Sequence, residues 1–159
     1  MPSAELHIYG NGDPEAEGMN RYVRNLDLTK NIFFRGHQED IVKVAINEHI
    51  DLSWFQGYNN SRPAGYAGFD ICSTGTPLLC WDFFDEPIKS LNNVYPHYKN
   101  LIRFVDKSIE ILTNSEKANE LSIIQFEDVK NNRDIKKTIN LLEKVYEEIL
   151  DNHKNIFEK

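Results

Sequence analysis

The stretch SRPAGYAGFDICSTGTPLLCWD, residues 61–82, decides how the chain is interpreted. It starts with small residues and glycines, carries a single acid, Asp70, in an otherwise apolar segment, and turns at Gly75 before an apolar run. Glycine and proline punctuate local structure, and the spacing of apolar residues sets its type. The stretch therefore predicts a glycine-rich loop, a helix over about 65–74 and a buried strand over about 77–81.

Strands and helices alternate on both sides of this stretch. We expect further strands at 5–9, 31–36, 50–55 and 100–104. We expect helices that begin at Asp13 and Gln38, and helices near 105–114, 116–128 and 132–152. Such alternation is typical of right-handed βαβ units. The chain is therefore predicted to be α/β, with a Rossmann-like parallel sheet of about five strands and helices on both faces.

Length and composition fit one globular domain. The chain has 159 residues, of which 40% are hydrophobic, and no run of about 18 apolar residues that would span a membrane. A net charge of −7 argues against nucleic acid as a partner. No cysteine and histidine cluster has the spacing of a zinc site. Cys72 and Cys80 lie in apolar surroundings, which favours buried free thiols in a reducing cytoplasm over a disulfide.

Glycines follow several of the expected strands, at Gly10, Gly12 and Gly36. Ligands bind parallel sheets at the carboxyl ends of the strands, so these turns are candidate ligand contacts. Gly10 and Gly12 lack the third glycine of a dinucleotide fingerprint, since Glu15 stands there, and a plain tight turn is the alternative. His37, just past a strand, is the one histidine kept as a candidate contact.

Glycines also surround the start of the helix that carries Asp70. Free amides near Gly65 and Gly68 suit an anion that approaches the backbone. Asp70, one turn further on, suits the hydroxyl groups of a ribose. The alternative is that the glycines allow close packing of helix on sheet and that Asp70 is merely exposed. The residues alone leave both interpretations open.

The last helix carries an amphipathic stripe. Its apolar residues follow a spacing of four, three, four and three: Ile135, Ile139, Leu142, Tyr146 and Ile149. We expect this stripe to pack against the domain's own core rather than against a partner helix.

The segments PSAELHIYGNG, LDLTKNIFFRGHQEDI, IDLSWF and PAGYAGFDICSTGTPLLCWD occur in an order that resembles the C-terminal half of group 1 (family 4-like) glycosyltransferases of the GT-B fold. In that family one strand ends in Gly-x-Gly and the next in Phe-x-Gly. A later segment has the form Glu, seven residues, Glu-Ala-x-x-x-Gly-x-Pro. Residues 70–77, DICSTGTP, match its second half, and the resemblance covers about residues 2–125.

The resemblance implies the donor-binding domain of a retaining glycosyltransferase, with a nucleotide sugar as substrate and no cofactor or metal. It implies that Asp70 binds the ribose and that Gly10, Gly12, Gly36 and His37 border the nucleotide. The backbone amides that would face the phosphate and sugar belong to Gly65, Tyr66, Ala67 and Gly68. It assigns no catalytic residue.

The sequence departs from the family at two positions. Arg62 stands where the family has its first Glu, and Asp70 is one methylene shorter than the second. These departures leave donor choice and activity open. Arg62 would pair with a phosphate or an acidic sugar, or would be an exposed loop residue.

The family's C-terminal half normally begins one βα unit earlier, with an Arg and a Lys that neutralise the diphosphate, and follows an acceptor domain. We therefore expect residues 1–159 to be a single nucleotide-sugar-binding domain, a fragment of a larger two-domain enzyme that is inactive alone. The parent is expected in the cytoplasm, resting on a membrane if it builds surface polysaccharide. Two alternatives are a nucleotide-sugar epimerase-type half-domain and a non-catalytic nucleotide-binding module.

Overall fold

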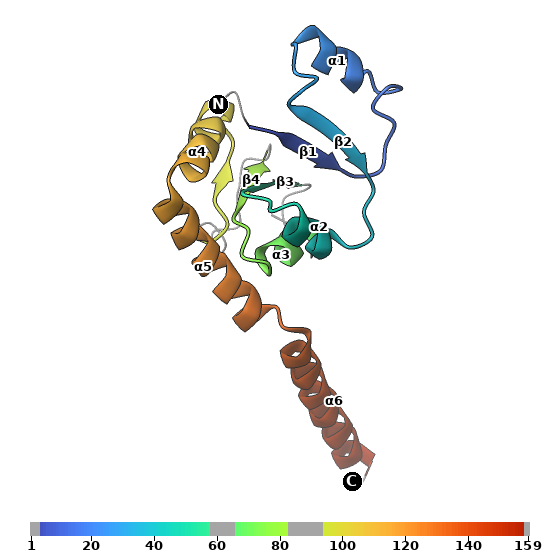
Figure 1. The fold of residues 1–159 in the computed structure, drawn as a ribbon. Helices are drawn as coiled ribbons and strands as arrows, with labels where there is room; N and C mark the ends of the chain where they lie inside the picture. Colours follow the sequence, from blue (N-terminus) through green and yellow to red (C-terminus); the bar gives the residue numbers. More distant parts are fainter. Residues whose placement is uncertain (1–3, 58–65, 83–93, 158–159) are drawn as a thin grey trace. The chain divides into compact units, whose positions relative to one another are not determined.

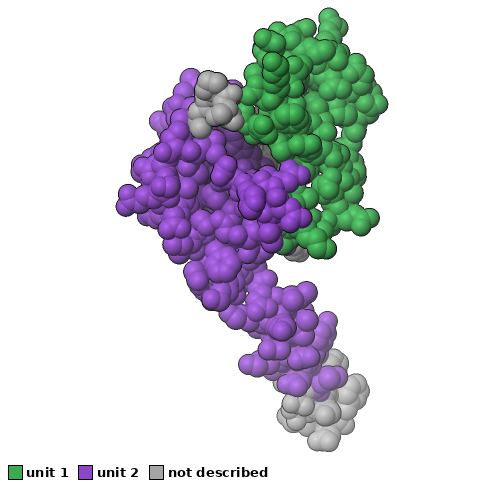
Figure 2. Space-filling view, in the orientation of Figure 1, with its two compact units in different colours: residues 1–44 green, residues 45–159 purple. Residues whose placement is uncertain are grey.

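The computed structural model describes residues 4–57, 66–82 and 94–157. The fold is α/β, with helices beside small parallel sheets (Figure 1). The chain divides into two compact units, residues 1–44 and 45–159 (Figure 2). The boundary between them falls inside the short helix α2 (Ile41–Asn47).

The first unit is built on one βαβ arrangement. Its elements are β1 (Leu6–Tyr9), α1 (Met19–Asn25) and β2 (Ile32–Gly36). β1 and β2 pair in parallel, and the register shifts after Ile8 so that Tyr9 faces Gly36. Both strands lie where the sequence predicts them.

The first helix begins later than the sequence predicts. Asp13 does act as a cap, because its carboxylate accepts hydrogen bonds from the backbone amides of Glu15 and Ala16 at 2.9 and 3.3 Å. The turn that it caps ends at Gly18, which adopts a left-handed φ of 72°. This conformation breaks the helical repeat, so α1 starts at Met19.

The second unit contains a three-stranded parallel sheet in the order β3 (Ser53–Gly57), β4 (Leu78–Asp82) and β5 (His97–Tyr98). The helix α3 (Tyr66–Cys72) connects β3 to β4. Three helices follow the sheet: α4 (Leu101–Thr113), α5 (Ser115–Asn132) and α6 (Ile135–Phe157).

β4 is the buried centre of this unit, as the apolar run after Gly75 predicts. Leu78 and Cys80 point to one face, where they join Cys72 of α3 and Tyr95. Leu79 points to the other face and packs against buried side chains of α4 and α5: Phe104, Ile111 and Leu121. Helices therefore cover both faces of this sheet. The buried cysteines are free thiols, in agreement with the sequence-based expectation.

The prediction of one sheet with about five strands is wrong. The described residues form five strands, but β1 and β2 make one sheet and β3, β4 and β5 another. β2 takes its backbone partner from β1, and β3 takes its partner from β4. Over the described ranges no ladder joins β2 to β3. Strand pairing depends on long-range contacts that the local pattern does not encode.

The expected strand at 100–104 is also wrong. The side chain of Asn100 accepts a hydrogen bond from the backbone amide of Arg103 at 3.1 Å and caps α4. Phe104, Ser108 and Ile111 then form its buried face at helical spacing. The short strand β5 lies just before this cap.

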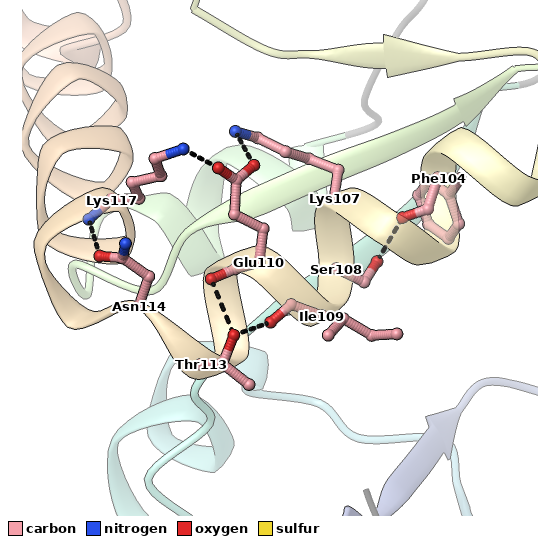
Figure 3. Close-up of polar contacts among 8 residues, drawn as sticks. All are labelled: Phe104, Lys107, Ser108, Ile109, Glu110, Thr113, Asn114 and Lys117. Carbon is pink, nitrogen blue, oxygen red and sulfur yellow. Dashed lines mark hydrogen bonds and ion pairs between the residues drawn. The ribbon is translucent and has the colours of Figure 1, made fainter.

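α4 and α5 are joined through a single residue. Asn114 ends α4, and its side chain accepts a hydrogen bond from the backbone amide of Lys117 to begin α5 (Figure 3). Glu110 forms ion pairs with Lys107 and Lys117, one on each helix (Figure 3). These contacts fix the sharp turn between the two helices.

α6 does not pack as the sequence predicts. Every described side chain from Ile135 to Leu150 is exposed, including the whole apolar stripe. The expectation that the stripe packs against the domain's own core is therefore wrong in this structure. Within the ranges that the structure describes, no helix is both long enough and apolar enough to cross a membrane.

Candidate functional site

The carboxyl ends of β1 and β2 bring together two of the loops that the sequence singles out. The backbone amide of Gly10 donates a hydrogen bond to the carbonyl oxygen of Gly36 at 3.0 Å. Gly10, Gly12, Gly36 and His37 are all exposed. The end of this parallel pair therefore presents open backbone, as ligand-binding edges of α/β sheets do.

The backbone conformation at position 36 requires glycine. Its φ is 71°, a left-handed value that residues with a side chain adopt at a cost. A Cβ placed there would meet none of the described atoms within 4 Å, so close packing does not explain the glycine. The backbone conformation of the turn therefore requires glycine, and the space beside its Cα is open to the described residues.

Arg35 is a residue of this edge that sequence reasoning missed. It is the last residue before Gly36, its side chain is exposed, and its guanidinium lies 5.1 Å from the centre of the Phe33 ring. Among the described residues it has no carboxylate within ion-pair distance. A guanidinium at the end of a strand suits a phosphate group. The signal was present in the sequence as Arg35-Gly36-His37 after a strand.

The helix α3 carries the second group of predicted site residues. Gly68 is buried and Ala67 and Asp70 are exposed. Burial of Gly68 agrees with the interpretation in which this glycine lets the helix pack closely. The exposed carboxylate of Asp70 has no hydrogen-bond partner among the described residues and is available to accept one from a ligand. The ligand role of α3 stays a prediction.

The inner face of α3 is held by a polar cluster at the end of α5. The guanidinium of Arg133 lies 3.5 Å from the centre of the Phe69 ring and also pairs with Asp128 at 3.4 Å. The hydroxyl of Tyr95 donates to the same carboxylate at 2.8 Å. The cluster fixes the rotation of α3 and so keeps Asp70 on the outer side.

Burial and hydrogen bonds shift the pKa values of this cluster. Burial acts to raise the pKa of Asp128, but hydrogen bonds from Asn132 and Tyr95 and the charge of Arg133 outweigh it and hold the pKa below its ordinary value. Burial, together with the bond to Asp128, raises the pKa of Tyr95. Burial also raises the pKa of the Cys72 thiol, to about 12, with the charge of Asp128 adding to the shift. At neutral pH the thiol and the phenol are therefore protonated, and the carboxylate of Asp128 is ionised.

His97 is a second residue that sequence reasoning passed over. It lies beside Cys80 in the sheet, and its Nδ1 is 2.6 Å from the carbonyl oxygen of Tyr95. Its Nε2 is buried and has no hydrogen-bond partner within the described ranges. Buried polar atoms without partners are uncommon. No sequence pattern around His97 predicted this position.

Other predicted site residues lie outside what the structure describes. Arg62 and Gly65 fall in the range 58–65, and of Tyr66 only the backbone, at the start of α3, is described. Among the described residues no group of three or more histidine, cysteine, aspartate or glutamate side chains could hold a metal ion.

Comparison with known proteins does not assign a family. A scan against protein-family models finds no match to the chain, and a search of curated proteins finds none either. The fold itself defines an α/β protein built from parallel βαβ arrangements, with an open glycine-containing edge in its first unit.

Proposed function

We propose that the chain is the donor-binding domain of a retaining glycosyltransferase, which transfers a sugar from a nucleotide sugar to an acceptor. The observation that carries the proposal is the contact between Gly10 and Gly36 at the carboxyl ends of β1 and β2. The resemblance to group 1 glycosyltransferases assigns these two loops to the nucleotide. Parallel α/β sheets bind nucleotides at this kind of edge.

The edge offers what a nucleotide diphosphate requires. Its backbone is open at Gly10 and Gly36, so a ligand can approach the peptide groups directly there, whereas the carboxylate of Glu17 lies beside Gly12. Arg35 supplies a positive charge beside them. The net charge of the chain is −7, so attraction of a diphosphate depends on such a local cation.

Asp70 has the proposed role of binding the ribose. Its exposed carboxylate accepts hydrogen bonds from vicinal hydroxyl groups, and its helix is fixed from behind by the cluster of Phe69, Arg133 and Asp128. The transfer itself depends on stabilising the leaving diphosphate and an oxocarbenium-like sugar. An acceptor domain and a cytoplasmic location, with peripheral membrane association, belong to the same proposal.

Calorimetric titration tests the proposal. We expect the chain to bind at least one nucleotide sugar from a panel of uridine, guanosine and adenosine diphosphate sugars. Asp70→Asn should weaken that binding on the order of tenfold to a hundredfold, since a hydrogen bond to a charged group contributes roughly 1.5–3 kcal/mol. Asp106→Asn, which removes an exposed acid from α4, is the matched control.

Two outcomes would contradict the proposal. One is that no nucleotide or nucleotide sugar in the panel binds the folded chain. The other is that Asp70→Asn binds as tightly as the wild type. Binding of free nucleotide diphosphates as tightly as their sugar conjugates would instead favour a non-catalytic nucleotide-binding module, which the substitution of Arg62 for the family's Glu already suggests.

A further inference from the structure

The apolar stripe of α6 is exposed along its described length. Ile135, Ile139, Leu142, Tyr146 and Ile149 keep between 47% and 71% of their surface accessible. α6 is a helix of 23 residues, Ile135–Phe157. The alternating spacing of four and three residues places these side chains on one face of the helix. Such an apolar face forms the interface, or seam, of a two-stranded coiled coil.

Charged side chains of both signs lie along α6. Lys136 and Lys137 lie in the first turn, whereas Glu147 and Glu148 lie three turns later. Glu143 lies between these two groups. A second helix that runs in the opposite direction can bring its Glu143, Glu147 and Glu148 within about one turn of Lys136 and Lys137. In a parallel pair in register, the lysines of one copy would lie beside those of the other.

We propose that α6 pairs antiparallel with α6 of a second copy of this chain. In the register that the residues favour, Ile139 packs against Leu142 of the second copy and Tyr146 packs against its Ile135. The twofold symmetry repeats both contacts, so four layers of the seam are filled by apolar side chains. This inference does not depend on the proposed function.

Flanking charges select this register. Lys136 directly follows Ile135, and Glu143 directly follows Leu142. Both charged residues therefore flank the stripe on the same side. In the proposed register Lys136 faces Glu143 of the second copy, and symmetry gives a second such pair. A shift by seven residues would pair Ile139 with Ile149 of the second copy. It would also bring Glu143 of one copy against Glu143 of the other. That like-charge contact is unfavourable.

Analytical ultracentrifugation of the full 159-residue chain tests the proposal. We expect a monomer–dimer equilibrium over the micromolar range that weakens with salt. Leu142→Asn should leave a monomer. Leu141→Asn should leave the dimer intact, because Leu141 is 66% exposed but lies one residue off the stripe. Circular dichroism of both variants checks that the fold is retained.

Charge reversal tests the register. Lys136→Glu and Glu143→Lys should each weaken the dimer by roughly tenfold or more, because each turns two attractive pairs into repulsive ones. The double variant should restore wild-type affinity. A chain that is monomeric at every concentration would overturn the proposal. So would a dimer that survives Leu142→Asn, equal effects of Leu141→Asn and Leu142→Asn, or a double variant that stays as weak as the single ones.

Discussion

The side chain of Gln125 satisfies both backbone hydrogen-bonding groups of Leu78. Its Oε1 accepts from the Leu78 amide at 2.7 Å, and its Nε2 donates to the Leu78 carbonyl oxygen at 2.8 Å. Nε2 also donates to the carbonyl oxygen of Val94 at 2.9 Å. Two residues further along β4, the backbone amide of Cys80 donates a hydrogen bond to the carbonyl oxygen of Pro96, which directly precedes β5. Gln125 therefore extends the ladder of β4 to a point that the two-residue strand β5 does not reach.

Replacement of Gln125 by leucine should destabilise the chain strongly. The substitution leaves the buried amide and carbonyl of Leu78 without these partners, and each buried group left unpaired costs roughly 1–3 kcal/mol. We expect a loss of at least about 3 kcal/mol in the free energy of unfolding, measured with urea. Asn119→Leu, at an exposed position of α5, should change it by less than about 0.5 kcal/mol. Equal stability of the two variants would show that the bonds of Gln125 are dispensable.

Asp128→Asn should remove a pH-dependent part of the stability. The pKa of Asp128 is lowered in the folded chain, so its ionised form contributes stability above its unfolded pKa, and this contribution is lost as the pH falls through the folded pKa. The variant should be less stable than the wild type at neutral pH, and the difference should shrink at about pH 3. Urea unfolding at both pH values measures it. A difference that is unchanged or larger in acid would contradict this account.

Neither cysteine should react in the folded chain at neutral pH. Cys72 and Cys80 have no exposed surface, and burial raises the pKa of the Cys72 thiol to about 12, so the reactive thiolate is scarce. A thiol-specific colorimetric reagent should detect both thiols in denaturant and neither in the native chain on the same timescale. Rapid native labelling would mean that the core around β4 opens readily. Absence of thiols in denaturant would mean a disulfide.

Gly36→Ala should cost stability without creating a clash. The left-handed φ of Gly36 is unfavourable for alanine by roughly 1–2 kcal/mol, and the space around its Cα is open to the described residues. Gly36→Asn should cost less, because asparagine tolerates this conformation better. Thermal unfolding of the two variants compares them. If alanine is tolerated as well as asparagine, the turn after β2 must relax to another conformation.

The sequence predicts elements well where the signal is local. The alternation in β1, the glycine after β2 and the apolar run of β4 each fix a strand within a few residues. Local signals also caused the errors. Asn100 precedes an apolar run that fits a strand, but its capping bond starts a helix instead. Asp13 has the features of a helix cap, and Gly18 delays the helix.

Long-range relations could not be predicted in the same way. Nothing near Gln125 in the sequence shows that its amide bonds to Leu78, 47 residues away. The division of the strands into two sheets depends on pairing, and the exposure of the α6 stripe depends on which surfaces meet. Of the candidate site, the meeting of Gly10 with Gly36 follows from parallel pairing, whereas Arg35 and His97 became visible through their positions in the structure.

The most direct test of the central claim is a nuclear magnetic resonance titration of the isotope-labelled chain with a nucleotide sugar. We expect amide shifts concentrated at residues 10–12, 36–37 and 66–70, and unchanged signals along α6. We also expect Asp70→Asn to reduce those shifts at the same ligand concentration while the spectrum stays that of a folded chain. Shifts confined to α4, α5 or α6, or no shifts up to millimolar ligand, would contradict donor binding by these residues.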